Sequence, residues 1–123
     1  MSQDASRPLA LIVRQAPYAQ RSARDQLDVA LAAASLGLPL EIYFLGDAIW
    51  QLVTGSDPQR ALLPRGLKGW GAIPDMTQAR FFAEQESCTR MANAGAECAV
   101  AVEAHDIASM SRRWRACRQV MAL

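Results

Sequence analysis

Short apolar runs recur along the chain, separated by longer segments in which apolar and polar residues mix. Residues Leu9–Val13 form a continuous apolar run rich in branched side chains, which is typical of a strand buried on both faces. Similar runs cover residues 40–45, 79–83 and 99–102. We therefore expect four buried strands, and a fifth strand over residues 119–123 at an edge of the sheet.

The segment after the first strand has the spacing of an amphipathic helix. Its apolar stripe consists of Leu27, Ala30, Leu31 and Ala34. Ser22 and Asp25 have the spacing of a capping box, with aspartate in place of the usual glutamate, so we expect the helix to begin there. Gly37 and Pro39 should end it, because glycine is common at helix ends and proline cannot continue a helix.

Later segments predict shorter helices. These cover residues 48–53, 87–94 and 107–116. Gly95 should end the second, and Asp106 is a natural N-cap for the third. Residues 54–74 are dense in glycine and proline and lack a clear period, so we expect an irregular connection with one helical turn near residues 60–63.

The alternation of strands and helices predicts the fold class. We expect a single domain over residues 1–123, a three-layer α/β/α structure with a mainly parallel five-stranded sheet and right-handed crossovers. In such sheets the functional crevice lies beyond the carboxyl ends of the strands. One rim should therefore collect the loops that begin at Arg14, Gly46, Glu84 and Glu103.

The composition is that of a globular protein. Hydrophobic residues make up 51% of the chain and charged residues 20%, and the net charge of +1 excludes a strong overall field toward nucleic acid or membrane. The polar residues 1–8 predict no signal peptide, and the nearly uncharged stretch 27–40 is too short to span a bilayer. We expect a cytoplasmic protein.

Cysteine and histidine are too sparse for a metal site. Cys88, Cys98 and Cys117 contain no Cys-x-x-Cys pair, and His105 is the only histidine, so we expect reduced thiols and no zinc. Residues 15–20 contain no glycine, which argues against a phosphate-binding loop and hence against a nucleotide or flavin site. We therefore expect no cofactor.

Three segments in the first half of the chain resemble the TusC/DsrF family in order and spacing: Arg14-Gln-Ala-Pro-Tyr18, Ala23-Arg-Asp-Gln-Leu-Asp-Val-Ala-Leu-Ala32 and Phe44-Leu-Gly-Asp-Ala-Ile-Trp-Gln-Leu52. The family pattern is an Ala-Pro-aromatic loop, an Ala-Arg-Glu-x-Leu-Asp helix and Phe-x-x-Asp-Gly-Val-aromatic-Gln-Leu. Residues 84–87 resemble its acidic Glu-Ser segment. Ala48 stands where glycine is usual, Cys88 where leucine is common, and Gly95 lies further from Ser87 than the pattern has it.

The resemblance implies a subunit of a TusBCD-like heterohexamer, a dimer of heterotrimers with TusB-like and TusD-like partners. Such complexes pass persulfide sulfur toward 2-thiolation of the tRNA wobble uridine, whereas the related DsrEFH complex serves sulfur oxidation. The transferring cysteine belongs chiefly to the TusD/DsrE-like subunit. The resemblance therefore implies a non-catalytic subunit that supports assembly and touches tRNA at most indirectly. A DsrF-like subunit in sulfur oxidation stays open as an alternative.

Cys88 allows two interpretations. In the first turn of a helix that begins at Ser87, the thiol would feel the positive end of the helix dipole, which favours the thiolate that carries sulfane sulfur. The resemblance adds that the active cysteine of DsrE-like subunits follows the third strand. However, a free cysteine often fills a small apolar space, and Glu84 and Glu86 would oppose a thiolate. We favour the packing role and keep a sulfur carrier acting through Cys88 as the alternative.

Five residues are candidates for contacts with sister subunits: Pro17, Tyr18, Asp28, Asp47 and Trp50. Aromatic residues are common at interface hot spots, and Asp28 belongs to the family-like Leu-Asp pair. We expect Asp28 to pair with Arg24, one helical turn earlier.

The basic cluster near the carboxyl-terminal end of the last helix consists of Arg112, Arg113, Arg115 and Arg118. Positive charge there is stabilised by the helix dipole, and Trp114 is the only nearby aromatic residue that could stack on a base. We interpret the cluster as a solvated face and His105 as a loop histidine.

Overall fold

The protein contains a five-stranded parallel sheet. The computed structural model describes residues 7–14, 20–53 and 65–123. The strands are β1 (Leu9–Val13), β2 (Leu40–Phe44), β3 (Ala79–Glu84), β4 (Val102–His105) and β5 (Gln119–Ala122). Their order in the sheet is β4-β3-β2-β1-β5, and every neighbouring pair is parallel. The expected fold class is confirmed.

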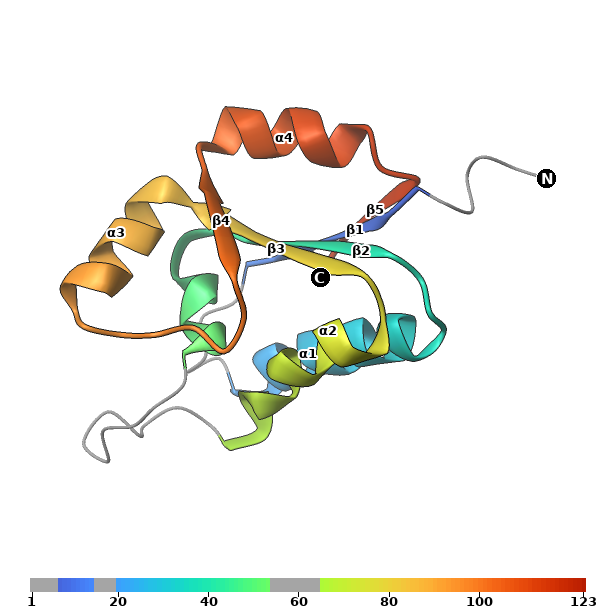
Figure 1. The fold of residues 1–123 in the computed structure, drawn as a ribbon, viewed down its shortest axis with the longest axis horizontal. Coiled ribbons are helices and arrows are strands. Elements are labelled where there is room, and N and C mark those ends of the chain that lie inside the picture. The colour runs from blue at the N-terminus through green and yellow to red at the C-terminus, as the bar shows by residue number, and fades with distance from the viewer. Residues whose placement is uncertain (1–6, 15–19, 54–64) are drawn as a thin grey trace.

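Helices cover both faces of this sheet (Figure 1). The helices are α1 (Gln20–Ser35), the 3-10 helices Gly46–Leu52 and Arg65–Ala72, α2 (Ile73–Met76), α3 (Gln85–Asn93) and α4 (Ile107–Arg115). In Figure 1, α1 and α2 lie below the sheet and α4 lies above it, while α3 extends beyond the carboxyl ends of the strands. The three layers are thus unequal, because α4 is the only helix of its layer within the described residues.

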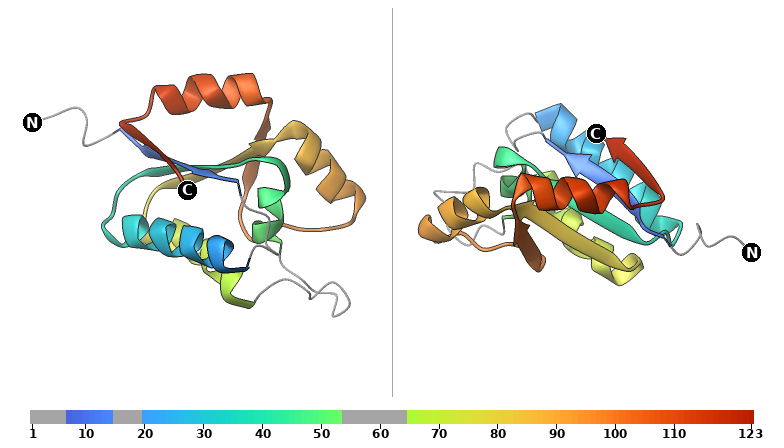
Figure 2. Two further views of the ribbon diagram at one scale, coloured as in Figure 1. Left: turned by 180° about the vertical axis from the view of Figure 1, so that it is seen from behind. Right: turned by 90° about the horizontal axis from the view of Figure 1, so that it is seen from above.

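The strand order explains this arrangement. From β1 to β4 the chain steps toward one edge of the sheet, and it then returns to β5 at the opposite edge. Crossovers of one hand that run in opposite directions must lie on opposite faces. Figure 2 accordingly shows α4 crossing the whole width of the sheet, from the end of β4 to the beginning of β5.

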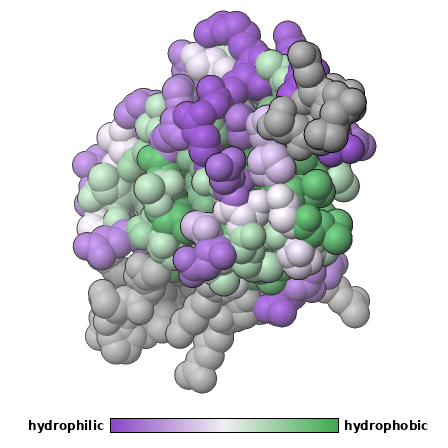
Figure 3. Space-filling model, turned by 45° about the vertical axis from the view of Figure 1, so that its right-hand side comes forward, coloured by the Kyte–Doolittle hydropathy of each residue, from purple (hydrophilic) through white to green (hydrophobic). Residues whose placement is uncertain are grey.

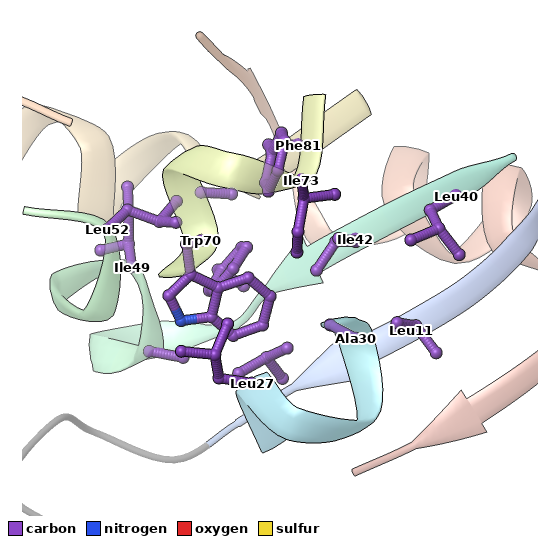
Figure 4. Packing of buried hydrophobic residues seen from close by; sticks show 14 of the residues in the cluster. Leu11, Leu27, Ala30, Leu40, Ile42, Ile49, Leu52, Trp70, Ile73 and Phe81 are labelled. Carbon is purple, nitrogen blue, oxygen red and sulfur yellow. The ribbon is translucent and has the colours of Figure 1, made fainter. Parts of the chain in front are cut away.

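The main core lies between the sheet and the α1 layer. Trp70, from the second 3-10 helix, is fully buried and lies among Leu27, Ile49 and Ile73 (Figure 4). Its indole ring meets Phe44 of β2 edge to face at 5.0 Å. The indole Nε1 donates a hydrogen bond of 3.1 Å to Gln51 Oε1, and Gln51 Nε2 donates to Gln26 Oε1 at 3.2 Å. These bonds satisfy polar atoms inside an otherwise apolar layer.

A smaller core lies under α4. Its buried members are Ala10, Tyr43, Phe82, Met110 and Cys117. The rings of Tyr43 and Phe82 stack at 4.7 Å, and Trp114 of α4 meets Tyr43 edge to face at 5.3 Å. This layer therefore depends on aromatic contacts from few residues.

Most of the expected elements are confirmed. β1 has the expected bounds, β2, β3 and β5 lie within one residue of them, and Asp106 caps α4 by accepting a hydrogen bond of 2.7 Å from Ser109 N. Gly37 and Gly95 both have positive φ where α1 and α3 have ended, as expected of helix-ending glycines. The expected helix over 48–53 is a 3-10 helix that begins two residues earlier, at Gly46.

Four expectations about elements were wrong. The helix α1 begins at Gln20, so Ser22 does not cap it. The fourth strand spans Val102–His105 instead of residues 99–102, and α3 begins at Gln85 instead of Ser87. Residues 65–74 are helical and not irregular, whereas the turn expected at residues 60–63 lies outside the described residues.

Candidate functional site

The carboxyl ends of the strands meet at one rim of the sheet. Arg14, Gly46 and Glu84 all lie there, as expected from the parallel order. The fourth loop begins at Asp106 and not at Glu103, because β4 continues to His105. His105 is thus the last residue of a strand, and its ring lies 5.6 Å from that of Phe82.

Two polar contacts tie the loops of this rim together. Gly46 N, at a residue with φ of +56°, donates a hydrogen bond of 2.9 Å to Glu84 Oε2 at the end of β3. Asp47 Oδ1 lies 3.9 Å from Arg90 Nη2 of α3, with both side chains more than half exposed. Glu84 therefore serves as a structural link, and its carboxylate is engaged with backbone.

Cys88 is partly buried at this rim. Because α3 begins at Gln85, Cys88 is the fourth residue of the helix and lies further from its positive end than a helix start at Ser87 would place it. The side chain packs against the main core, and burial raises the pKa of the Cys88 thiol. The thiol is accordingly protonated at neutral pH, the form that is poor at accepting sulfur.

The other two thiols are also protonated. Burial raises the pKa of Cys98 to about 11, with a smaller contribution from Cys88 when that thiol ionises, and burial together with Glu41 raises the pKa of Cys117 to about 11. Cys98 forms an isolated antiparallel bridge with Val53, and Cys117 Sγ lies 3.7 Å from Arg113 O. In the environment that the structure shows, all three cysteines behave as small apolar residues.

The three candidate interface residues that the structure describes lie on two different helices. Asp28 lies on the solvent side of α1 and pairs with Arg24 at 3.2 Å, which confirms the expected ion pair. Asp47 and Trp50 lie three residues apart on the 3-10 helix Gly46–Leu52, a spacing that places them on the same side. Asp47 is exposed, whereas Trp50 is half-buried against the main core. Pro17 and Tyr18 lie outside the described residues.

A buried polar cluster under α4 was not expected from the sequence. Glu41 on β2 is only 7% exposed. It accepts hydrogen bonds from the Tyr43 hydroxyl and from Arg113, whose Nε and Nη2 lie 2.9 and 3.2 Å from its two oxygens. Burial and the Glu41 carboxylate raise the pKa of the Tyr43 phenol far above its ordinary value. A glutamate inside an apolar strand was the available signal, but its partner Arg113 had been interpreted as solvated.

Two hollows of the described surface reach the opposite rim. A cavity of about 500 Å³ extends beside α4 and is lined by residues that include Glu41, Arg112, Arg113 and, at the carboxyl end of β4, His105. Another, of about 690 Å³, lies at the amino ends of β2 and β3. The crevice expected beyond the carboxyl ends is not among these hollows.

Two further observations concern only residues 7–14, 20–53 and 65–123. Within these ranges no helix has the length and apolar character needed to cross a membrane. Nor do they bring three histidine, cysteine, aspartate or glutamate side chains together as a metal site would require.

The structure thus defines a small three-layer α/β protein whose thiols are shielded. Residues 8–123 match the model of the DsrE/DsrF-like family, and the chain belongs to this family. It is similar to a TusC homolog of Pseudomonas aeruginosa, with 43% identity over 53 residues that cover 43% of this chain and 44% of that protein. A TusC homolog of Aliivibrio fischeri is 32% identical over 54 residues, 44% of this chain and 46% of that protein. These relatives place the chain in the TusC/DsrF subfamily.

Each of these matches spans less than half of the relative's own length. Among solved structures, the YchN protein of Escherichia coli has a TM-score of 0.74 at 14% identity, covering 95% of this chain and 99% of that chain. This likeness shows that the fold is shared over nearly the whole chain.

Proposed function

We propose that this protein is a non-catalytic, TusC/DsrF-like subunit of a sulfur-relay complex, supporting persulfide transfer toward 2-thiolation of the tRNA wobble uridine. Membership of the TusC/DsrF subfamily supports a role in sulfur relay. The observation that carries the non-catalytic role is the state of the thiols, since burial raises the pKa of Cys88, Cys98 and Cys117 alike. A relay cysteine needs the opposite environment, one that favours the thiolate.

The partners that we propose are TusB-like and TusD-like subunits in a heterohexamer. Asp47 and Trp50 project from one side of the same short helix beside the carboxyl rim, next to α3. An exposed carboxylate beside a half-buried aromatic side chain is a common composition for an interface. We extend the proposal to Pro17, Tyr18 and Asp28.

Co-expression with TusB-like and TusD-like proteins tests this proposal. The three chains should elute together in size-exclusion chromatography. Asp47→Arg should weaken the complex about tenfold, because it reverses a charge at the proposed contact. Asp75→Arg, the same change on α2 at the opposite rim, is the matched control and should leave assembly intact. A chain that stays alone in the presence of both partners would refute the proposal.

A sulfur carrier acting through Cys88 is the second candidate, favoured by the position of this thiol just after β3. The protein would be incubated with a cysteine desulfurase and cysteine, and persulfides would be detected by mass spectrometry. The proposed non-catalytic role predicts little loading, equal in wild type and Cys88→Ser. Loading that disappears in Cys88→Ser and persists in Cys98→Ser would instead establish the carrier.

A further inference from the structure

The outer side of α4 carries positive charge without negative charge. The nine residues of α4 include Arg112, Arg113 and Arg115 and no acidic residue. Arg113 turns inward to Glu41, whereas Arg112 and Arg115, three residues apart, are exposed on the solvent side. Figure 3 shows mostly hydrophilic surface at the top of the molecule, where α4 lies.

Two further arginines lie where α4 ends. Arg118 is exposed at the turn into β5, and Arg7 donates a hydrogen bond of 2.7 Å from Nη2 to Ala116 O. Both side chains line a small hollow at this end of the sheet. Arg112 lines the cavity of about 500 Å³ on the other side of the same turn. We call Arg112, Arg115 and Arg118, with Arg7 beside them, the α4 patch.

The arginines of the α4 patch differ from those elsewhere in their partners. Arg24, Arg80 and Arg90 each lie within 4.0 Å of a carboxylate. Among the described residues, no carboxylate lies that close to Arg112, Arg115 or Arg118, and Arg112 Nη2 contacts only the Ser109 hydroxyl, at 3.1 Å. The helix dipole stabilises charges in its last turn by about 0.3–1 kcal/mol each but does not neutralise them. Asp106, at the start of α4, is a carboxylate that interacts with Arg112 at longer range. The patch therefore presents more positive than negative charge.

The chemistry of the surroundings selects the partner. Stable protein interfaces have an apolar centre, but Ile107 at the start of α4 is the exposed large apolar residue of this helix, whereas Met110 is buried and Trp114 packs against Tyr43. The patch also offers no exposed aromatic ring on which a base could stack. Guanidinium groups suit phosphate, which they can bind with paired hydrogen bonds.

We propose that the α4 patch binds the phosphate backbone of a nucleic acid, without reading its sequence. This inference does not depend on the proposed function, because it rests on the charges around α4. Three phosphate contacts would give a dissociation constant on the order of 10⁻⁴–10⁻⁶ M at physiological salt. Because such contacts release counterions, raising the salt concentration from about 50 to 200 mM would weaken binding roughly 20- to 40-fold.

Fluorescence anisotropy with a labelled RNA hairpin and the full chain tests the proposal. The triple variant Arg112→Gln, Arg115→Gln, Arg118→Gln should bind at least about tenfold more weakly and with a flatter salt dependence, since each lost contact lowers the slope by about one. The control variant Arg14→Gln, Arg24→Gln, Arg90→Gln changes the net charge equally, on other parts of the surface. It should bind like the wild type, and circular dichroism should show both variants folded.

Three results would overturn the proposal. The first is absence of RNA binding at low salt. The second is an equal loss of affinity in the control variant, which would mean that binding follows net charge and not the α4 patch. The third is competition by polyglutamate as strong as that by unlabelled RNA, which would identify the patch as a surface for acidic proteins.

Discussion

Glu41 is the residue on which the contact between α4 and the sheet depends most. Its carboxylate is almost fully buried and joins β2 to Arg113 of α4. A buried carboxylate is costly unless its oxygens are paired, and here Tyr43 and Arg113 together supply the donors. Removing it leaves both donors without an acceptor.

We expect Glu41→Ala to lower the free energy of unfolding by about 2–3 kcal/mol, because the Tyr43 hydroxyl and part of the Arg113 guanidinium would stay unsatisfied. Tyr43→Phe should cost about 1 kcal/mol, since Glu41 keeps its bonds to Arg113. Urea denaturation measures both. Glu103→Ala removes an exposed ion pair with Arg80 and should cost less than about 1 kcal/mol. An equal cost for Glu103→Ala would show that burial is not what makes Glu41 important.

The shielded thiols predict a loss of stability in alkali. Cys98 and Cys117 have pKa values of about 11 in the folded chain and ordinary values near 9.0 when unfolded. The unfolded chain thus releases its thiol protons first as the pH rises, so stability is full below about pH 9 and falls above it. Unfolding by urea, with reductant, between about pH 8 and pH 10 should show this decrease.

The double variant Cys98→Ala, Cys117→Ala is the control for that decrease and should show a flatter profile. The measurement stays at or below about pH 10 because the unfolded Tyr43 phenol begins to ionise there, and its raised pKa acts in the same direction. A wild-type profile as flat as that of the variant would mean that the thiols are solvated.

At the scale of elements, α1 and the 3-10 helix Arg65–Ala72 make a close contact at Gly69. A Cβ atom at this position would lie 3.2 Å from Leu27 Cδ2 and 3.3 Å from Leu31 Cδ1. These distances are tighter than ordinary packing, so only glycine lets the two elements approach without displacing the leucine methyl groups.

Gly69→Ala should therefore destabilise the protein by about 1 kcal/mol through overpacking, and Leu27→Ala by about 2–5 kcal/mol through a cavity. In the double variant the new methyl group fills part of the cavity, so the combined loss should be smaller than the sum by about 0.5 kcal/mol or more. Thermal or urea unfolding of the four proteins measures this coupling. Additive losses would place Gly69 away from Leu27.

The elements that could be predicted were those whose local pattern agrees with their surroundings. β1 and β2 are apolar and buried, and the Arg24–Asp28 pair follows from helical spacing alone. The fourth strand was placed too early because residues 99–102 are more apolar than the true strand. Ala99 N instead bonds Leu52 O, and Glu103 in β4 is stabilised by Arg80 of the neighbouring strand.

Long-range contacts account for the remaining errors. The segment from Arg65 to Met76 is rich in glycine, yet it is helical because Trp70 and Ile73 are buried in the main core, and such packing overrides propensity. The Glu41–Arg113 contact joins residues 72 positions apart and requires knowing which helix covers which face. The thiols could be named from the sequence, but their burial could not.

At the scale of the whole molecule, the central strand and one edge strand of the sheet differ in how far they are shielded from solvent. All five residues of β2 are buried, whereas all four residues of β5 are exposed, Val120 and Met121 among them. β5 pairs only with β1, and its outer edge is open within the described residues. Stability should therefore fall from the centre of the sheet toward β5.

Native-state hydrogen exchange followed by NMR measures this gradient. The β2 amides that bond to neighbouring strands should exchange only by global unfolding. Those of β5 should exchange faster through local opening, because few apolar contacts hold this strand. Equal protection in β2 and β5 would mean that the whole sheet opens as one unit.

The path of the chain through the sheet has a consequence for biosynthesis. Of the five strands of this sheet, β1 is made first, and it finds one neighbour early, when Leu9 meets Leu40, but its other neighbour only when Gln119 has been made. Throughout that interval the edge of β1 that will pair with β5 has unpaired backbone N–H and C=O groups. Other polypeptides can bind to these groups and to the apolar side chains beside them. The growing chain should thus need chaperone protection until α4 and β5 emerge, and a pause in translation before them should promote aggregation.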